Sequence, residues 1–396
     1  MITAEQELFG TFLDYIQQEL DLPDEVRRDA IGKYDHLTRW FKKDNQERFR
    51  TDSDLYPQGS FRLGTVIKPV KDEGDYDLDL VYRRELARES TTQQDLVKSA
   101  GEQLTRYIQY LNYTGEEVPT LHPRQRCWRL QYGKKFHMDV LPAIPDDEPG
   151  ENNIRNLDDA ILITDKDRHQ WQHSNPRGYA DWFDDQQKVM LVEQREFMAK
   201  AAKVDVEAIP VEVVKTPLRR AIQLLKRHRD LRYQGDPEDK PISIIITTLA
   251  AKAYRNESSV YAAVTSLARN MAQQIQKRDG VYWVPNPVNP NKENFADKWA
   301  SHPQRAQRFF EWLKQVDADI VASSQQRGLD KVTESLGNIF GKDVAERAMA
   351  RHGDARYKQR EAGKLRMEAG TGILGAVGTQ VKGHTFFGTQ TQDKTP

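Results

Sequence analysis

The chain has 396 residues, with 59 Lys and Arg against 60 Asp and Glu, and a mean hydropathy of −0.79. This length leaves room for two domains, and the near-neutral charge argues against a protein that wraps long DNA or RNA. The single cysteine, Cys127, excludes an internal disulfide and any multi-cysteine zinc site, and we expect it to be a small buried side chain.

Targeting signals are not evident in the sequence. Residues 1–8 lack the basic and apolar regions of a signal peptide. The longest apolar runs, such as residues 244–246, are far shorter than a membrane span. We therefore expect a cytoplasmic protein without a membrane partner.

Hydrophobic periodicity predicts the elements of the first half of the chain. Helices are predicted over residues 5–20, 24–43 and 93–112, and strands over residues 75–82, 128–132 and 136–141. The composition of residues 145–153 is that of an exposed loop.

Helical patterns dominate the second half. They cover residues 180–204, 216–232, 241–254, 258–277 and 303–316. The tail from about residue 353 is rich in glycine and polar residues, and we expect its end to be mobile. These patterns predict a mixed α and β part over residues 1–183, a helical part over 184–350 and a tail over 351–396.

The strand over residues 75–82 has an unusual pattern, because Asp75, Asp77 and Asp79 occupy alternate positions. Side chains at i and i+2 of a strand share a face, so like charges repel there, and Asp is disfavoured in strands. A Mg²⁺ ion, which prefers carboxylate oxygens, relieves this repulsion. We expect Asp77 and Asp79 to hold metal, and Asp75, beside Gly74 at the strand entrance, not to be a ligand. An edge strand with one face in water remains the alternative for this motif alone.

Two other features complete a candidate site. Gly59 and Ser60 form a turn in which close backbone approach, N–H groups and a hydroxyl suit phosphate oxygens. Asp139 lies within an apolar run, where a charge requires a partner, and a neighbouring strand would bring it to the same metals. These residues predict two-metal catalysis, with Asp139 as general base. We expect His137 on the opposite face of its strand, in the core.

The later segments are less specific. Residues 215–232 contain seven Lys or Arg and one Asp, which fits either a phosphate-binding helix or a solvated basic face. Ser243 lies in a β-branched run that favours a strand by propensity. We expect most of the aromatic residues near the boundary of the two parts to pack in the core; they are Trp171, Tyr179, Trp182 and Phe183.

The ordered set Gln58-Gly-Ser, Asp77-Leu-Asp and Asp139 resembles the polymerase-β-like nucleotidyltransferase superfamily. Within it the chain resembles the cGAS/DncV-like nucleotidyltransferases (CD-NTases), bacterial enzymes that make cyclic oligonucleotide signals. Segments 174–183, 219–230 and 240–249 extend the resemblance, which covers roughly residues 50–260.

This resemblance implies an α+β fold, in which a nucleotidyltransferase core with a mixed sheet and a C-terminal helical domain enclose the active-site cleft. It implies that Asp77, Asp79 and Asp139 hold two Mg²⁺ ions, for which Mn²⁺ could substitute. It also implies a helix that opens after Pro241. The residues implied to hold the donor triphosphate are Gln58, Gly59, Ser60, Lys226 and Ser243.

The function implied by the resemblance is cyclic oligonucleotide synthesis. A ribose hydroxyl of one NTP attacks the α-phosphate of another, pyrophosphate leaves, and repetition closes a cyclic di- or trinucleotide. ATP is the expected first substrate, and the second NTP is left open. The family acts in CBASS anti-phage defence, so a product-activated effector and a CBASS regulatory protein are expected partners, whereas double-stranded DNA is not.

Two alternatives remain at this point. An RNA-end nucleotidyltransferase needs a basic track for its acceptor, which the near-neutral charge does not favour. A degenerate, non-catalytic nucleotide sensor would have lost acids that this chain retains. The bases, the ring size, the linkage and the modification of the C-terminus are left open.

Overall fold

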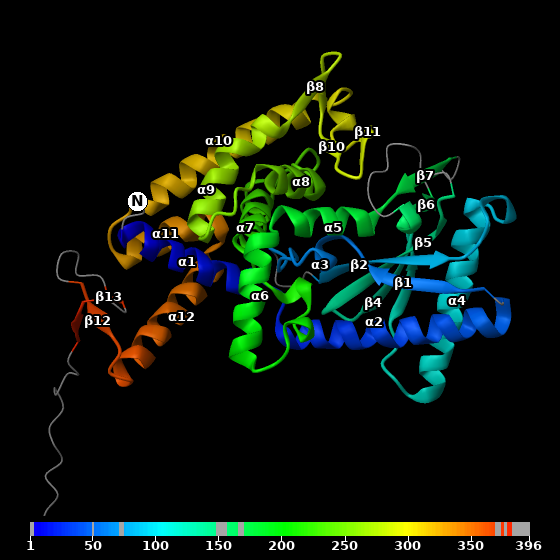
Figure 1. Ribbon diagram of the computed structural model, residues 1–396, viewed down its shortest axis with the longest axis horizontal. Helices are drawn as coiled ribbons and strands as arrows, with labels where there is room; N and C mark the ends of the chain where they lie inside the picture. Colours follow the sequence, from blue (N-terminus) through cyan, green and yellow to red (C-terminus); the bar gives the residue numbers. More distant parts are fainter. Residues whose placement is uncertain are drawn as a thin grey trace, which may run out of the picture.

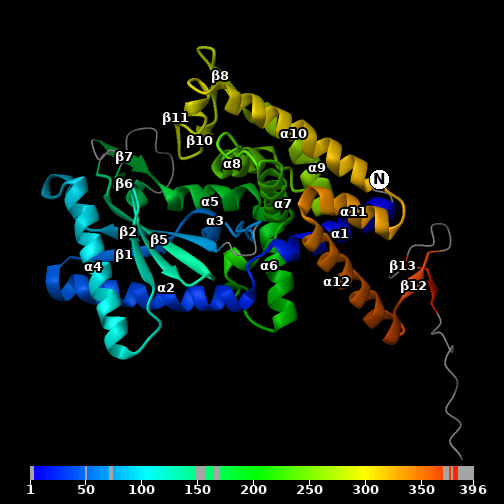
Figure 2. The ribbon, with the colours of Figure 1, turned by 180° about the vertical axis from the view of Figure 1, so that it is seen from behind.

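The computed structural model describes residues 4–49, 51–70, 75–147, 157–164, 170–368, 374–375 and 378–381. A mixed sheet with long helices packed on it forms one half of the molecule, and a bundle of helices forms the other (Figure 1 and Figure 2). This α+β architecture confirms the predicted fold class.

The sheet half contains three helices and seven strands of the described chain. Its helices are α2 (Asp24–Asp44), which continues into a π-helical turn (Asn45–Phe49), α3 (Gly59–Arg62) and α4 (Gln93–Thr114). Its strands are β1 (Ser53–Pro57), β2 (Tyr76–Arg84), β3 (Thr120–Pro123), β4 (Trp128–Tyr132), β5 (Phe136–Pro145), β6 (Ile161–Thr164) and β7 (Trp171–Ser174).

The helical half contains the first helix of the chain and those that follow the sheet. They are α1 (Ala4–Leu20), α5 (Pro176–Gln186), α6 (Lys188–Ala202), α7 (Pro217–Arg232), α8 (Ser243–Ala253), α9 (Val260–Asn270), α10 (Pro303–Ser324), α11 (Leu329–Phe340) and α12 (Lys342–Glu361). Short strands accompany them: β8 (Gln276–Arg278), β9 (Val281–Trp283), β10 (Pro285–Asn286), β11 (Asn289–Asn294), β12 (Arg366–Met367), β13 (Leu374–Gly375) and β14 (Thr379–Gln380).

The large sheet has the strand order β1-β2-β5-β4-β3, and β6 and β7 extend it from the C-terminal end of β5. β2 and β5 form its central pair and run parallel, whereas the other neighbours are antiparallel. The register pairs Asp77 with His137 and Asp79 with Asp139. Four polar side chains therefore share one face at the centre of the sheet.

The alternation of β2 separates an apolar face from a polar one. Tyr76, Leu78, Leu80 and Tyr82 are buried and belong to the core that the sheet forms with α2 and α4. Each fully buried leucine contributes about 2 kcal/mol, which helps to offset the unfavourable placement of aspartates in a strand. The aspartates between them face away from this core.

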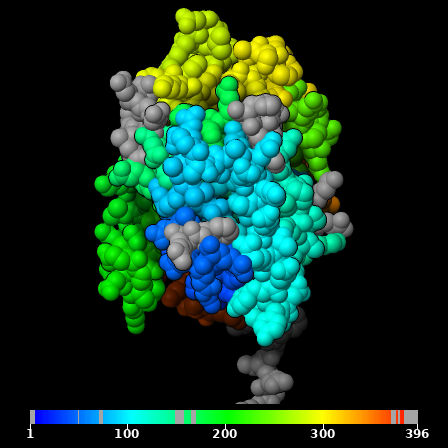
Figure 3. All heavy atoms as spheres, turned by 90° about the vertical axis from the view of Figure 1, so that its right-hand side faces the viewer, coloured from blue at the N-terminus to red at the C-terminus, as the bar shows by residue number. Residues whose placement is uncertain are grey.

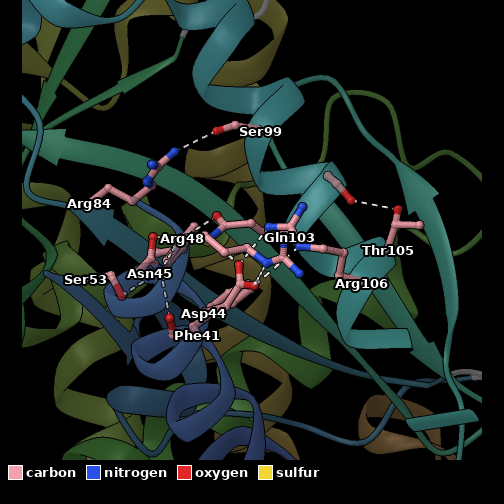
Figure 4. Close-up of polar contacts among 12 residues, drawn as sticks. Phe41, Asp44, Asn45, Arg48, Ser53, Arg84, Ser99, Gln103, Thr105 and Arg106 are labelled. Atoms are coloured by element: carbon pink, nitrogen blue, oxygen red, sulfur yellow. Dashed lines mark hydrogen bonds and ion pairs between the residues drawn. The ribbon is translucent and has the colours of Figure 1, made fainter. Parts of the chain in front are cut away.

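A buried polar network fixes α2 against the sheet (Figure 4). The Asn45 amide donates to the Tyr82 hydroxyl of β2 at 2.6 Å, and that hydroxyl donates to Gln103 of α4 at 2.7 Å. Gln103 and Arg106 both donate to the buried Asp44 carboxylate. The π-helical turn begins at this network and lets the chain leave α2 toward β1.

A second core lies among the helices of the other half. Phe12, Leu13 and Ile16 of α1 are buried in it, so the first helix of the chain packs with helices that follow the sheet. Seen from the sheet end, the yellow segment around residues 275–300 lies above the blue and cyan residues of the sheet half (Figure 3). None of the described helices is both long and apolar enough to cross a membrane.

Several predicted helices have different bounds in the structure. The helix predicted over residues 180–204 is two helices, because Gln187 leaves helical geometry and its side chain accepts a hydrogen bond from Thr216, the N-cap of α7. The helix predicted over 258–277 ends at Asn270, since a 3₁₀ turn and β8 follow it. Helix α10 extends beyond the predicted end at residue 316, and α11 was not predicted.

The predicted tail from residue 353 begins inside α12, which continues to Glu361. Ala345, Ala348 and His352 bury one face of the earlier part of this helix, and its last turns, after residue 353, are exposed or half-buried. The expected mobile end concerns residues 382–396, which lie outside the described residues.

Candidate active site

Three predicted metal-binding acids lie on one face of the sheet. Asp77 and Asp79 come from β2, and Asp139 lies beside Asp79 on the parallel strand β5. Burial, and then the carboxylates of Asp77 and Asp139, raise the pKa of Asp79 to about 7. A pKa near 7 means that the surroundings favour the neutral, protonated form of this side chain. A bound cation would instead favour the charged carboxylate.

The start of α3 lies directly against these acids. Gly59 has a φ of +59°, and a Cβ atom at this position would lie 2.6 Å from Asp79 Oδ2. The backbone N–H of Gln58 donates to the Asp79 carbonyl at 2.8 Å. Glycine is therefore required at residue 59 both for the backbone conformation and for the approach of the turn to the carboxylate.

Strand β4 supplies a cation that the sequence analysis did not identify. Arg129 lies opposite Asp139 in the register, and its Nε and Nη2 donate to the two Asp139 oxygens at 2.7 Å each. This bidentate pair fixes the orientation of the Asp139 carboxylate and offsets part of its charge. The sequence contained no signal for it beyond an arginine in a predicted neighbouring strand.

His137 was predicted in the core on the opposite face; it is buried, but the predicted face was wrong. It is two residues before Asp139 on the same strand, so both side chains project from the same face. Its Nδ1 lies 2.6 Å from Asp75 Oδ2, and its Nε2 lies 2.9 Å from Asp77 Oδ1. We call the set Asp75, Asp77, Asp79, His137 and Asp139 the acidic face.

Cys127 was predicted to be buried, but it is partly exposed. It precedes β4, next to the acidic face, because the register of β4 brings the start of that strand near Asp139. Burial, followed by the carboxylates of Asp139 and Asp79, raises the pKa of its thiol. The protonated thiol is therefore the form expected at neutral pH.

The acidic face is compatible with a divalent cation. One ligand atom each from Asp77, His137 and Asp139 lies within 4.8 Å of the others, a spacing that a single ion can span. Carboxylate oxygens suit Mg²⁺ and Mn²⁺, and an imidazole nitrogen is more typical of transition metals. The residues present therefore fit a metal centre.

A cavity of about 410 Å³ connects the acidic face with helices α7 and α8. We call it the central cavity. Five predicted site residues line it, namely Ser60, Asp77, Asp79, Lys226 and Ser243. Gln58, Gly59 and Asp139 are not among its lining residues but contact those that are. The lining also includes Asp75, which was expected not to be a ligand, and Thr65, Arg229 and Asp230, which the sequence did not indicate.

Lys226 reaches the central cavity from α7. Its ammonium donates to the carbonyl and the hydroxyl of Thr65, each at 3.0 Å. Burial, and then the nearby Arg229, lower the pKa of Lys226 to about 7. Among the described residues it has no carboxylate partner, so an anion in the cavity would find an unpaired cation.

Ser243 begins α8, so the helix implied by the family resemblance is correct and the strand favoured by propensity is not. Its hydroxyl accepts a hydrogen bond from Arg229 Nη1 at 2.8 Å. Arg229 is buried and also donates to Asp230, at 3.0 Å. The N-terminus of α8 and the end of α7 thus form one polar wall of the central cavity.

A second cavity, of about 560 Å³, shares Ile244 with the central cavity. We call it the side cavity. Trp171, Phe295 and Trp299 contribute aromatic surface to it. Tyr179, Trp182 and Phe183, in contrast, are buried in the helical core, as expected for aromatic residues at the junction.

Comparison with known proteins gives consistent matches. A family model described as a Second Messenger Oligonucleotide or Dinucleotide Synthetase domain matches residues 5–187. The chain is 28% identical over 359 residues to a c-di-GMP synthase from Roseivirga ehrenbergii, and the match covers 90% of each chain. It is 24% identical to the cyclic dinucleotide synthase CdnG from Bradyrhizobium diazoefficiens, over 86% of this chain and 83% of the other.

Solved structures share the fold. The CD-NTase CdnG from Bradyrhizobium diazoefficiens in complex with GTP has a TM-score of 0.67 and 20% identity, and the match covers 87% of this chain and 99% of that one. The Escherichia coli CdnC structure with ATP has a TM-score of 0.61 and 12% identity, covering 84% of this chain and 96% of that one.

Proposed function

The chain belongs to the cGAS/DncV-like nucleotidyltransferase (CD-NTase) family and is a nucleotidyltransferase that makes cyclic oligonucleotides, and on this premise we propose its reaction and setting. It joins two or three NTPs by metal-dependent nucleotidyl transfer and releases pyrophosphate at each bond. The cyclic product acts in CBASS anti-phage defence by activating a separate effector protein. The names of the relatives, c-di-GMP synthase and cyclic dinucleotide synthase, favour a guanine nucleotide among the substrates, with ATP as the other candidate.

In the proposed site, Asp77, Asp79 and Asp139 hold the divalent ions. When bound, these ions lower the pKa of the attacking ribose hydroxyl and neutralise the charge that develops on the leaving pyrophosphate. Asp139, held in place by Arg129, accepts the proton of that hydroxyl on a carboxylate oxygen. The paired β2 and β5 strands supply the rigidity that keeps the three carboxylates together.

The donor triphosphate lies in the central cavity. Ser60 and the Gly59 turn contribute a hydroxyl and N–H groups, and Lys226 contributes a buried ammonium that gains an anionic partner. Ser243, oriented by Arg229, adds a hydroxyl at the N-terminus of α8, where the helix dipole favours anions. Gln58 acts through its backbone by anchoring the turn to Asp79.

The side cavity takes part of the second nucleotide. Its aromatic residues offer surfaces for a base, and Arg126, Lys292 and Lys298 have no ion pair within the part of the chain that the structure describes. Nucleotide pockets usually place the base against an aromatic surface and the phosphates beside cations that have no other ionic partner. The shared Ile244 places this pocket next to the donor phosphates.

The observation that carries this proposal is the pairing of Asp79 with Asp139 across the central parallel strands, together with Lys226, which lines the same cavity as Asp79 and has no carboxylate partner among the described residues. Carboxylates on one side and a buried ammonium on the other fit a metal-bound triphosphate between them. A pocket that only senses nucleotides would not require the three acids, and dependence of the reaction on added RNA distinguishes an RNA-end nucleotidyltransferase.

The test is incubation of the purified protein with all four NTPs and Mg²⁺ or Mn²⁺, followed by mass spectrometry of phosphatase-resistant products. We expect a cyclic di- or trinucleotide from the wild type and none from Asp77→Asn. The matched control, Asp35→Asn, changes an exposed aspartate on α2 and retains synthesis. Labelling that depends on added RNA, or equal synthesis by Asp77→Asn, would contradict the proposal.

A further inference from the structure

The acidic face contains a buried nitrogen whose surroundings do not satisfy it. His137 is only 5% exposed, and its Nε2 has no hydrogen-bond partner in the described parts of the chain. Asp77 Oδ1 lies 2.9 Å from this nitrogen, but the two atoms are not aligned as a hydrogen bond. A buried polar atom of this kind requires a reason, because leaving it unpaired costs about 1–3 kcal/mol.

The other nitrogen of the ring is fully engaged. Nδ1 lies 2.6 Å from Asp75 Oδ2, and because a carboxylate only accepts, the ring donates its N–H there. Asp75 is held in turn by the Gln131 amide at 2.6 Å, from the residue opposite His137 on β4. A neutral ring whose Nδ1 carries the hydrogen presents a bare lone pair at Nε2.

This arrangement, in which one ring nitrogen donates to a carboxylate and the other has a free lone pair, is typical of a histidine that binds a metal. Metal-ligating histidines nearly always donate their second ring N–H to a carboxylate or carbonyl, which fixes the tautomer and strengthens the ligand. Nε2 lies 2.9 Å from Asp77 Oδ1, and one ligand atom each from Asp77, His137 and Asp139 lies within 4.8 Å of the others. Because Arg129 already engages both oxygens of Asp139, a neutral nitrogen ligand would complete the shell without adding negative charge.

We propose that His137 Nε2 is a direct ligand of the divalent cation at the acidic face, and that Asp75 is the positioning residue that fixes its tautomer. A nitrogen ligand favours first-row transition ions over Mg²⁺, so this site binds Mn²⁺ in preference to Mg²⁺. The inference rests on the proposed function only in requiring a divalent ion there. Asp75 thereby gains a role at the site without being a ligand itself.

The competing arrangement is an imidazolium that bridges Asp75 and Asp77. Nε2 would then donate a proton to Asp77, and any metal would be held by oxygens alone. The two arrangements place different atoms next to the metal and can therefore be distinguished spectroscopically.

The test is pulsed electron paramagnetic resonance of Mn²⁺ added below one equivalent to the full chain without a histidine tag and without nucleotide. We expect electron spin echo modulation from a directly coordinated imidazole nitrogen in the wild type and its loss in His137→Gln. Titration calorimetry should show that His137→Gln lowers the preference for Mn²⁺ over Mg²⁺. Asp75→Asn, which keeps His137 but removes its acceptor, should weaken Mn²⁺ binding by about 10- to 100-fold.

A matched control exists in the same chain. His173 makes the same Nδ1 contact with a carboxylate, Asp146, at 2.6 Å, but lies outside the acidic face. His173→Gln should leave the nitrogen modulation and the Mn²⁺ affinity unchanged. Circular dichroism of each variant verifies that it is folded.

Wild-type protein that binds Mn²⁺ without nitrogen modulation would overturn the proposal, and it needs no variant to do so. Modulation that persists in His137→Gln would overturn it as well. Nitrogen modulation in a protein that makes no cyclic product would retain this ligand assignment and contradict the proposed function instead, so the two failures are distinguishable.

Discussion

The two sides of the central cavity carry ionisable groups of opposite charge. On the sheet side, aspartates of β2 and β5 lie side by side, and burial followed by their repulsion raises the pKa of Asp79. On the helix side, Lys226 is buried in α7 without a carboxylate partner among the described residues, and its pKa is lowered. Both sides therefore disfavour the charged form of a functional group.

This difference shows that the cavity is organised for a ligand that carries both signs of charge. If Lys226 paired with one of the aspartates, the pKa of the aspartate would fall and the pKa of Lys226 would rise, so both charged forms would be favoured. The fold keeps the groups apart instead, by attaching the acids to a sheet and the cation to a helix anchored to Thr65. A metal-bound triphosphate supplies the missing partner to each side.

Asp79→Asn should have the largest effect, because it removes the central charge of the sheet side. We expect cyclic product formation to fall by about a thousandfold, the equivalent of several kcal/mol of lost charge stabilisation. Initial rates with saturating Mn²⁺ and NTPs measure this, and a rate within tenfold of the wild type would contradict it.

The same variant should stabilise the metal-free protein. The raised folded-state pKa of Asp79 means that its stabilising contribution is present below pH 4 and is lost as the pH rises through 7. The advantage of Asp79→Asn in thermal unfolding with chelator should therefore grow between pH 4 and 7 and then level off. An advantage that is the same at pH 4 and pH 8 would show that ionisation is not the cause.

Lys226→Met should have the next largest effect, because it removes the charge of the helix side. Loss of a charged hydrogen bond to phosphate costs about 1.5–3 kcal/mol, so affinity for the triphosphate should fall by about 10- to 100-fold. Since the pKa of Lys226 in the free protein is about 7 and a phosphate raises it, binding above pH 7 should take up a proton.

Calorimetry in buffers of different ionisation enthalpy measures this proton. The uptake should be absent in Lys226→Met and unchanged in Lys252→Met, a control that removes another partly buried lysine with a lowered pKa, bonded to the Pro285 carbonyl. Equal proton uptake in all three proteins would rule out Lys226 as its source.

Gly59→Ala should have a moderate effect on the sheet side. The added Cβ would meet Asp79 Oδ2 at 2.6 Å, so the carboxylate has to move, and we expect about a tenfold lower rate. The positive φ adds about 1 kcal/mol of destabilisation. Gly115→Ala has the same backbone cost, at φ +74°, but nothing within 4 Å, and it should lose stability while retaining full activity.

Ser243→Ala should have the smallest effect. It removes one hydroxyl and leaves Arg229 with its contacts to Asp230 and the Pro241 carbonyl, so we expect about a fivefold rise in KM. Ser259→Ala removes a serine that caps α9 and should lower the unfolding temperature without changing KM. An unchanged KM in Ser243→Ala would remove this residue from the phosphate site.

Some of the site followed from local sequence. The spacing of Asp77 and Asp79 dictated a shared strand face, and the charge of Asp139 in an apolar run indicated a required partner. The same rule of spacing places His137 and Asp139 on one face, so the wrong orientation predicted for His137 was avoidable. Ser243 required the family resemblance, because propensity alone favoured a strand.

Other members of the site could not be read from the sequence. Arg129 meets Asp139 only because β4 pairs with β5 in one particular register, and Thr65 meets Lys226 across a long stretch of chain. Register depends on how the turns and the apolar core fit together, which no local pattern specifies.

By itself, the sequence determined which strand carries the carboxylates, where α7 and its cations lie, and which family the chain resembles. Only the tertiary structure decided that α1 packs with the later helices, that Arg129 holds Asp139, and that the His137 ring lies between Asp75 and Asp77. The reason is that periodicity fixes the face on which a side chain lies, whereas strand order and register, set by the packing of distant segments, decide what that side chain contacts.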